Sequence, residues 1–311
     1  MSTTARSNDR DWCTRAYKAI QSLQDRLQSL DALDCPGVLW CTLLLGLFEL
    51  MIEVTGGQWA KHMLYGTSRI LQLSGAGGGG DYLGGQSFET FRLLEGNRAI
   101  LYGDNTVLSS HSYHDITSTS PLDEILNSMA GISSFSKSFF DQIESIPEEQ
   151  RQRHPDIDQL AASACILQYQ LQSWYTQHSS SINSSGPYGK LALANYHALQ
   201  LFLCRNFTYY NFWDMKVIPV LTLSELEHHV TGILGQCSAI LEHSRIAALL
   251  TIFPLRMAGA NAMNDEDRNE TIRLLELVSQ KGFVVSARIK FDLLDLWEYQ
   301  FLNSRDSGVK A

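Results

Sequence analysis

Histidines are the first side chains in this chain that could hold a metal ion. His228, His229 and His243 fall on one predicted helix. Their spacing is not that of a ligand set, and neither an HExxH nor an HxH sequence occurs. We therefore expect surface or capping histidines and no bound metal.

Acid–base or nucleophilic catalysis would need a paired arrangement that the sequence does not supply. A hydrolase requires a Ser or Cys on a sharp turn with a histidine partner, and no G-x-S-x-G sequence occurs. The carboxylates Asp141, Glu144, Glu148 and Glu149 cluster near one predicted helix end, where they would be solvated. We predict no catalytic residues and no enzymatic activity.

A run of glycines over residues 75–80 is the one segment that suggests phosphate binding. It follows a predicted helix rather than a strand, and it lacks the Lys-Ser/Thr pair of a P-loop. Because glycine disfavours ordering, residues 75–85 are predicted to form a flexible loop. No cofactor is expected.

The cysteines also lack the spacing of a metal or redox site. No CxxC pair occurs, and the only close pair, Cys35 and Cys41, does not match a common zinc knuckle. We expect buried free thiols in a reducing compartment at all six positions, which are Cys13, Cys35, Cys41, Cys165, Cys204 and Cys237.

Composition bounds the class of protein. The chain has 311 residues, 44% of them hydrophobic and 18% charged, as in an ordinary globular protein. Its net charge of −9 argues against a broad phosphate-binding surface. The N-terminus lacks the apolar core of a signal peptide, and the longest apolar run, residues 38–48, is too short to span a bilayer. We therefore expect no membrane association.

The elements that must position any site are predicted to be helices throughout. Apolar residues recur at three- and four-residue steps, and no convincing alternating pattern indicates a strand. The fold class is all-α, a multi-helix bundle or solenoid-like packing of antiparallel helices. Helices are predicted over about residues 9–30, 38–54, 59–73, 88–102, 121–129, 133–146, 157–177, 188–213, 223–243, 266–278 and 284–302. The helix over 38–54 is apolar nearly all round and should be central.

Residues 246–268 are predicted to form the central helix of the domain. The stretch is apolar, but Pro254 interrupts it, so the helix must kink or restart there. Gly259 lies among alanines and lets another backbone approach closely. Asn264 then has the position of a cap for the following helix, with Arg268 one turn further on.

Composition also divides the chain. A tract rich in Ser, with Gly and Pro, over residues 179–187 is predicted to be a linker or a long loop. The resulting divisions are an N-terminal helix within 1–36, a domain over 37–302 with halves 37–178 and 187–302, and a disordered tail over 303–311.

Aromatic residues gather after this tract, and they allow two interpretations. They form part of the core, or they line an apolar ligand cavity between helices. The set is Tyr196, Phe202, Phe207, Tyr209, Tyr210, Phe212 and Trp213.

Four motifs in order resemble the fungal-specific transcription factor domain. In residues 49–73, Trp59-x-x-His62 leads to Gly66 and a leucine-rich turn, and residues 85–109 are similar to the family's next helix, with Arg98 and Leu108 at matching places. The late Phe-Pro-Leu…Ala-Gly…Ala…Arg pattern and the terminal Trp are carried by Phe253, Pro254, Leu255, Ala258, Gly259, Ala262, Arg268 and Trp297. The resemblance covers residues 37–302.

This resemblance implies the regulatory part of zinc binuclear-cluster transcription factors of ascomycete fungi. It implies an all-helical fold, action in the nucleus, formation of a homodimer or a heterodimer with a DNA-binding factor, and in some members a pocket for a small apolar effector. Many members control gene clusters for secondary metabolism.

The chain departs from the family pattern in two respects. Those factors bind DNA through cysteines packed closely near the N-terminus, whereas the six cysteines here span residues 13 to 237. This argues against direct DNA binding by this polypeptide. The resemblance also begins inside the usual domain, so two explanations stay open: the chain dimerises with a full-length factor, or it comes from a truncated gene.

The hypothesis is a transcription regulator with an effector-sensing or dimerisation domain. The alternative is a stand-alone protein that binds an apolar metabolite or another protein without contacting DNA. Candidate pocket or switch residues are Trp59, His62, Phe202, Phe253, Pro254, Met257, Gly259 and Arg268.

Overall fold

The structure is a computed structural model that describes residues 36–68, 86–109, 120–182, 185–213 and 216–308, with Lys18 and Ser22 in isolation. The helix predicted over 9–30 and the glycine-rich loop predicted over 75–85 lie outside the described residues. The side chain of His62 lies outside them as well.

The described residues form helices and no strand, which confirms the all-α class. The elements are α2 (Pro36–Ile52), α3 (Gly57–Lys61), the π-helical η2 (His62–Thr67), α5 (Gln86–Tyr102), the 3₁₀ turn η3 (Val107–Ser109), α7 (Pro121–Ser145), α8 (Glu148–Arg151), α9 (Pro155–Ile182), α10 (Gly186–Thr208), α11 (Leu223–His243), the 3₁₀ turn η4 (Ala248–Thr251), α12 (Ile252–Asn261), α13 (Asp265–Gln280) and α14 (Val285–Gly308).

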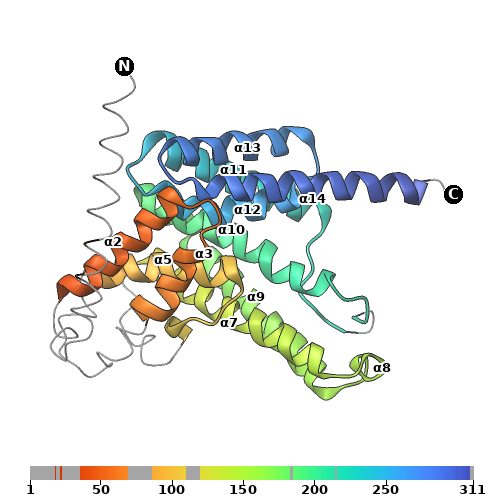
Figure 1. Ribbon diagram of the computed structural model, residues 1–311. Coiled ribbons are helices and arrows are strands. Elements are labelled where there is room, and N and C mark those ends of the chain that lie inside the picture. The colour runs from red at the N-terminus through yellow and green to blue at the C-terminus, as the bar shows by residue number, and fades with distance from the viewer. Residues whose placement is uncertain are drawn as a thin grey trace.

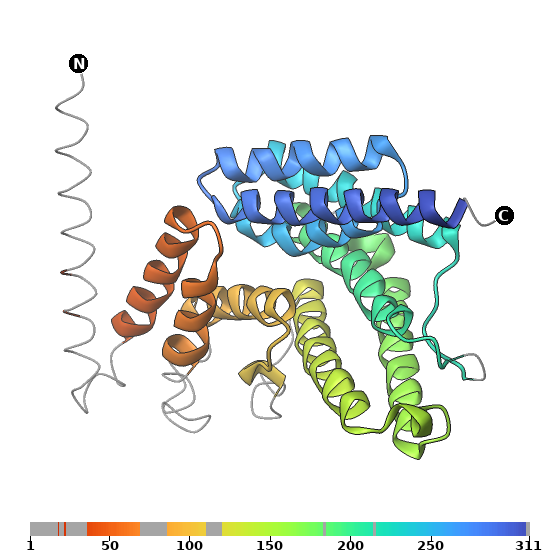
Figure 2. The ribbon, with the colours of Figure 1, turned by 45° about the vertical axis from the view of Figure 1, so that its right-hand side comes forward.

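The helices pack in two groups that α10 connects (Figure 1). One group is the layer of α11, α12, α13 and α14, in which α13 and α14 lie side by side. The other contains the α7–α9 hairpin, which ends at α8, and α5, which packs on α7. Figure 2 shows α10 running from the layer down along this hairpin. Because α10 contacts α7, α9, α11 and α12, it is the common wall of both groups.

Two predicted helices, 121–129 and 133–146, are one helix, α7. The Gly and Ser residues between them do not break it, because Ile125, Met129, Ile132 and Phe139 make a continuous buried stripe. At its start the Ser120 hydroxyl accepts a hydrogen bond from the Asp123 backbone N–H.

The tract over residues 179–187 is shorter than a linker. Helix α9 continues to Ile182, and α10 begins at Gly186. A methyl group on Gly189 would lie 2.4 Å from the carbonyl oxygen of Ile182, so the two helix ends are packed closely. The larger core cluster contains residues from both sides of this turn.

Helix α2 is not central, contrary to the prediction. Leu43 and Leu50 are buried, but Leu44, Met51 and Ile52 are exposed. The reason is its place at one end of the molecule, where it packs against α3, η2 and α5 on one side. Helix α14 also departs from its prediction, since it continues to Gly308 rather than ending near residue 302.

The predicted helix over 246–268 restarts instead of kinking. The 3₁₀ turn η4 precedes α12, and Pro254 is the third residue of α12. A proline in the first turn is tolerated because the N–H it lacks would have no partner within the helix. The Asn264 side chain accepts a hydrogen bond from the Asp267 N–H and so caps α13, as predicted.

Helix α12 is central, as predicted. It contacts α10, α11, α13 and α14. Gly259 lets α14 come close: the Trp297 indole N–H donates to the Gly259 carbonyl at 2.9 Å. A methyl group at Gly259 would lie 2.5 Å from Leu293 Cδ1 and 3.0 Å from Thr271 Cγ2.

A buried ion pair holds the end of α5. Arg98 and Glu95 both have 0% side-chain exposure, and the guanidinium donates to both carboxylate oxygens at 2.8 and 2.9 Å. Arg98 also donates to Asp104 and to the Asn105 carbonyl, both at 2.9 Å. These bonds give Arg98, which the sequence marked as a family position, a structural role.

We predict that Gly259→Ala lowers the free energy of unfolding by about 1–2 kcal/mol, because the added methyl overpacks the contact with the buried Leu293. Gly235, an exposed glycine of α11 with nothing near its Cα, is the matched control. Gly235→Ala should stabilise the protein by about 0.5–1 kcal/mol, since alanine favours the helix. Urea denaturation measures both changes. Equal stabilisation of the two variants would contradict the close packing of α12 on α14.

Candidate functional site

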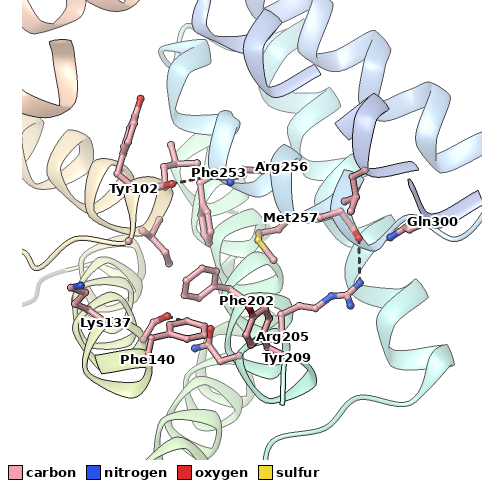
Figure 3. Close-up of a pocket in the computed structure, with 17 residues that line it drawn as sticks. Tyr102, Lys137, Phe140, Phe202, Arg205, Tyr209, Phe253, Arg256, Met257 and Gln300 are labelled. Atoms are coloured by element: carbon pink, nitrogen blue, oxygen red, sulfur yellow. Dashed lines mark hydrogen bonds between the residues drawn. The ribbon is translucent and has the colours of Figure 1, made fainter. Parts of the chain in front are cut away.

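A hollow of about 670 Å³ lies between α5, α7, α10, α12 and α14, and we call it the first hollow. Figure 3 shows Phe202, Phe253 and Met257 directed toward its interior from α10 and α12. The rings of Phe202 and Phe253 meet edge to face, with centroids 6.1 Å apart. This gives the hollow an apolar wall.

The polar side of the first hollow is cationic. Lys137, Arg205 and Arg256 line it, and no carboxylate is among its lining residues. Arg256 Nη1 donates to the Leu101 carbonyl at 2.9 Å, which fixes that guanidinium at the rim. Lys137 is paired with Asp141 on its own helix, at 3.1 Å.

A second hollow, of about 600 Å³, lies on the other side of Arg205. Its walls come from α10, from the end of α12 and from residues 218–221, and Arg268 lines it as well. Arg205 and Ala260 line both hollows, so the two cavities are neighbours.

A third hollow, of about 450 Å³, lies between α2, α5, η4, α12 and α14. Trp59 and Tyr102 line it with their rings 6.0 Å apart. Burial raises the pKa of Tyr102 to about 12. Its hydroxyl donates to the Thr55 carbonyl at 3.1 Å.

The structure divides the predicted site residues among these places. Phe202, Phe253 and Met257 meet in the first hollow, as a ligand cavity would require. Arg268 lies in the second hollow and Trp59 in the third. Pro254 and Gly259 are buried in α12. The seven of these residues that the structure describes in full therefore do not form one site, and the side chain of His62 lies outside the described part.

The predicted set of aromatic residues after the Ser-rich tract also lies in more than one place. Phe207 and Trp213 belong to a second core cluster around Phe139, as the core interpretation predicts, and Phe207 also lines the second hollow. Phe202 and Tyr209 line the first hollow.

The cations of the first hollow were missed from the sequence. One signal for Arg205 existed: it is the only charged residue of α10 after Lys190, in an otherwise apolar helix. The same signal marks Arg256, which is the only charged residue of α12. No comparable signal marks Lys137, because α7 is an ordinary amphipathic helix.

One histidine and two cysteines differ from their predictions. His228 and His243 are exposed, but His229 is buried, and its Nδ1 lies 2.9 Å from Nδ1 of His197. At this distance one neutral ring donates and the other accepts. Cys41 is exposed and Cys165 half-buried, contrary to the prediction, whereas Cys204 and Cys237 are buried free thiols. Cys13 and Cys35 lie outside the described residues. Among the described residues, no group of three or more His, Cys, Asp or Glu side chains is arranged to hold a metal ion.

The chain belongs to the family of the fungal specific transcription factor domain, whose model matches residues 3–300. The match begins well before residue 37, where the resemblance read from the sequence starts. No curated protein and no solved structure matches the chain. Family membership gives the protein a role in transcription regulation, and the family is one of regulatory domains rather than of enzymes. None of the described helices has the length and apolar character to cross a membrane.

The buried histidine pair predicts a loss of stability in mild acid. Burial lowers the pKa of His197 to about 3 and that of His229 to about 4, from an ordinary value of 6.5. The unfolded chain therefore takes up protons first, so the stabilising contribution is complete above pH 6.5 and is lost as the pH falls toward these values. Each ring should account for about 2 kcal/mol of lost unfolding free energy between pH 7 and pH 5.

In His229→Gln this pH-dependent loss should be smaller by about 2 kcal/mol. Urea titrations of both proteins at pH 5, 6 and 7 measure it. The same dependence on pH in both proteins would show that His229 is not buried in its neutral form.

Proposed function

We propose that the protein is an effector-responsive transcription regulator, which acts in the nucleus of a fungus and binds a small apolar effector in the first hollow. The observation that supports this proposal is the apolar wall that Phe202, Phe253 and Met257 form in a cavity of about 670 Å³. Cavities of this size, with a few polar groups on an apolar wall, suit small-molecule ligands. The regulated genes that the resemblance implies are those of secondary metabolism.

Helix α12 is the element through which such a ligand would act. Phe253 and Met257 face the first hollow, while Gly259, further along the same helix, is packed against Leu293 of α14. Because close-packed helices transmit displacement, a ligand that moves α12 also moves α14. Only a ligand with different affinity for the two arrangements would shift their populations.

Helix α14 supplies a surface for self-association. It extends past the end of α13 (Figure 1), and a group of large apolar side chains on it is exposed. Such clusters mark interaction surfaces, and we propose that a second copy of the chain pairs with this one. The group is Phe291, Leu294, Tyr299, Phe301 and Leu302.

A stand-alone metabolite-binding protein would bind its ligand in the same hollow without changing transcription. The two functions differ in whether occupancy of the hollow changes transcription. The first experiment below therefore measures binding and transcription on the same variants.

Nile red, a neutral apolar dye, should bind the protein with increased fluorescence, and Phe202→Ala should weaken binding about tenfold, because an aromatic wall worth about 1.5–3 kcal/mol is lost. Tyr169→Ala, which removes an exposed ring of α9, is the matched control and should bind normally. Fused to a heterologous DNA-binding module in a fungal reporter strain, Phe202→Ala should change output and Tyr169→Ala should not. Normal dye binding by folded Phe202→Ala would remove the first hollow as the site. Weakened binding with unchanged output would favour the stand-alone function.

Self-association should depend on the exposed face of α14. We expect the unmodified protein to sediment as a dimer, and the double variant Phe291→Glu, Leu302→Glu as a monomer, because buried unpaired carboxylates oppose association. Ile166→Glu, at an exposed apolar residue of α9, should remain dimeric. Sedimentation velocity distinguishes these states. A dimer that survives the α14 changes would place the interface elsewhere.

A further inference from the structure

We infer that the second hollow binds an elongated apolar molecule that ends in a carboxylate, with the carboxylate held by Arg205 and Arg268. This site is separate from the first hollow and does not depend on its function.

The hollow has apolar walls on two sides. Leu201 and Phe207 of α10 form one wall, and Ile218, Val220 and Leu221, from the segment between α10 and α11, form the other. A volume of about 600 Å³ accommodates a chain of a dozen carbons. Burying such a chain contributes about 0.8 kcal/mol for each CH₂ removed from water.

Both arginines are fixed at the same end of α12. Arg205 donates from Nε to the Asn261 side chain at 2.8 Å and from Nη2 to the Ala260 carbonyl at 3.3 Å. Arg268 donates from Nε to the Ala262 carbonyl at 3.3 Å. Since their partners are three consecutive residues, both guanidinium groups lie near the same end of α12, and both arginines line the hollow.

These bonds leave donors for a ligand. A guanidinium has five N–H groups, and each arginine uses only part of this capacity. Arg268 Nη1 lies 3.9 Å from an oxygen of Asp265, whose side chain is 93% exposed, so this pair is weak. The Arg268 guanidinium also lies 5.4 Å from the centre of the Trp297 ring, which holds its plane in position.

The charge of the site is unusual for this protein. The chain has 33 acidic and 24 basic residues, yet no carboxylate is among the residues that line the second hollow. Capping of the last carbonyls of α12 explains where the arginines lie. It does not explain why two cations line one hollow whose lining residues include no carboxylate, whereas a ligand carboxylate that accepts from both does.

The test uses displacement of cis-parinarate, a fluorescent carboxylate with a long apolar chain, from the full chain. Dodecanoate should displace it at least about tenfold more effectively than dodecan-1-ol, because hydrogen bonds to a charged group contribute about 1.5–3 kcal/mol. Arg268→Met should weaken dodecanoate binding about tenfold or more and leave the alcohol unchanged.

Two pairs of variants locate the site. Met263→Glu puts a carboxylate in the second hollow and should abolish dodecanoate binding, while Val217→Glu, on an exposed neighbouring residue that does not line it, should not. Arg256→Met, at a residue that lines the first and third hollows but not the second, should also have no effect. Thermal denaturation checks that Arg268→Met and Met263→Glu are folded.

The inference is wrong if parinarate does not bind, if the alcohol competes as well as the acid, or if folded Arg268→Met binds dodecanoate normally. Loss of binding in Arg256→Met alone would place the anion in the first or the third hollow, and it would overturn this site while leaving the proposed function intact. Loss of the Nile red response without loss of dodecanoate binding would overturn the proposed function and leave the site in the second hollow intact.

Discussion

The contact between α12 and α14 at Gly259 constrains the rest of the C-terminal layer. The absence of a side chain there lets Leu293 rest on the backbone of α12 and lets the Trp297 indole reach the Gly259 carbonyl at 2.9 Å. A helix held this closely can move only together with its neighbour. Because α12 also contacts α10, α11 and α13, its position determines where the walls of all three hollows lie.

The end of α12 is the place where the Arg205 and Arg268 side chains form hydrogen bonds. Its last carbonyls have no partner within the helix, and the Arg205 and Arg268 side chains supply donors from two other elements. Arg205 then lines both the first and the second hollow. One side chain that completes a helix end therefore also separates two cavities.

The all-α class, the central place of the segment around Gly259 and the Asn264 cap could be predicted because each depends on local signals: periodicity, small residues and a capping side chain. The central position predicted for α2 was wrong, since an apolar sequence does not reveal which partners are available to cover it. The separation of Trp59 from Phe202 depends on packing between distant segments, which spacing does not encode. The facing of His197 and His229 depends on the crossing of α10 and α11, and for the same reason no sequence pattern marks it.

The segment between α10 and α11 has a consequence for how this protein diversifies. Residues 218–221 form a wall of the second hollow, but they lie outside any helix, and Val220 is exposed. Loops of this kind accept substitutions and length changes that helices do not. In the binding site that we propose there, changes in this wall would alter the ligand preference, while the packed layer of α11 to α14 stays unchanged.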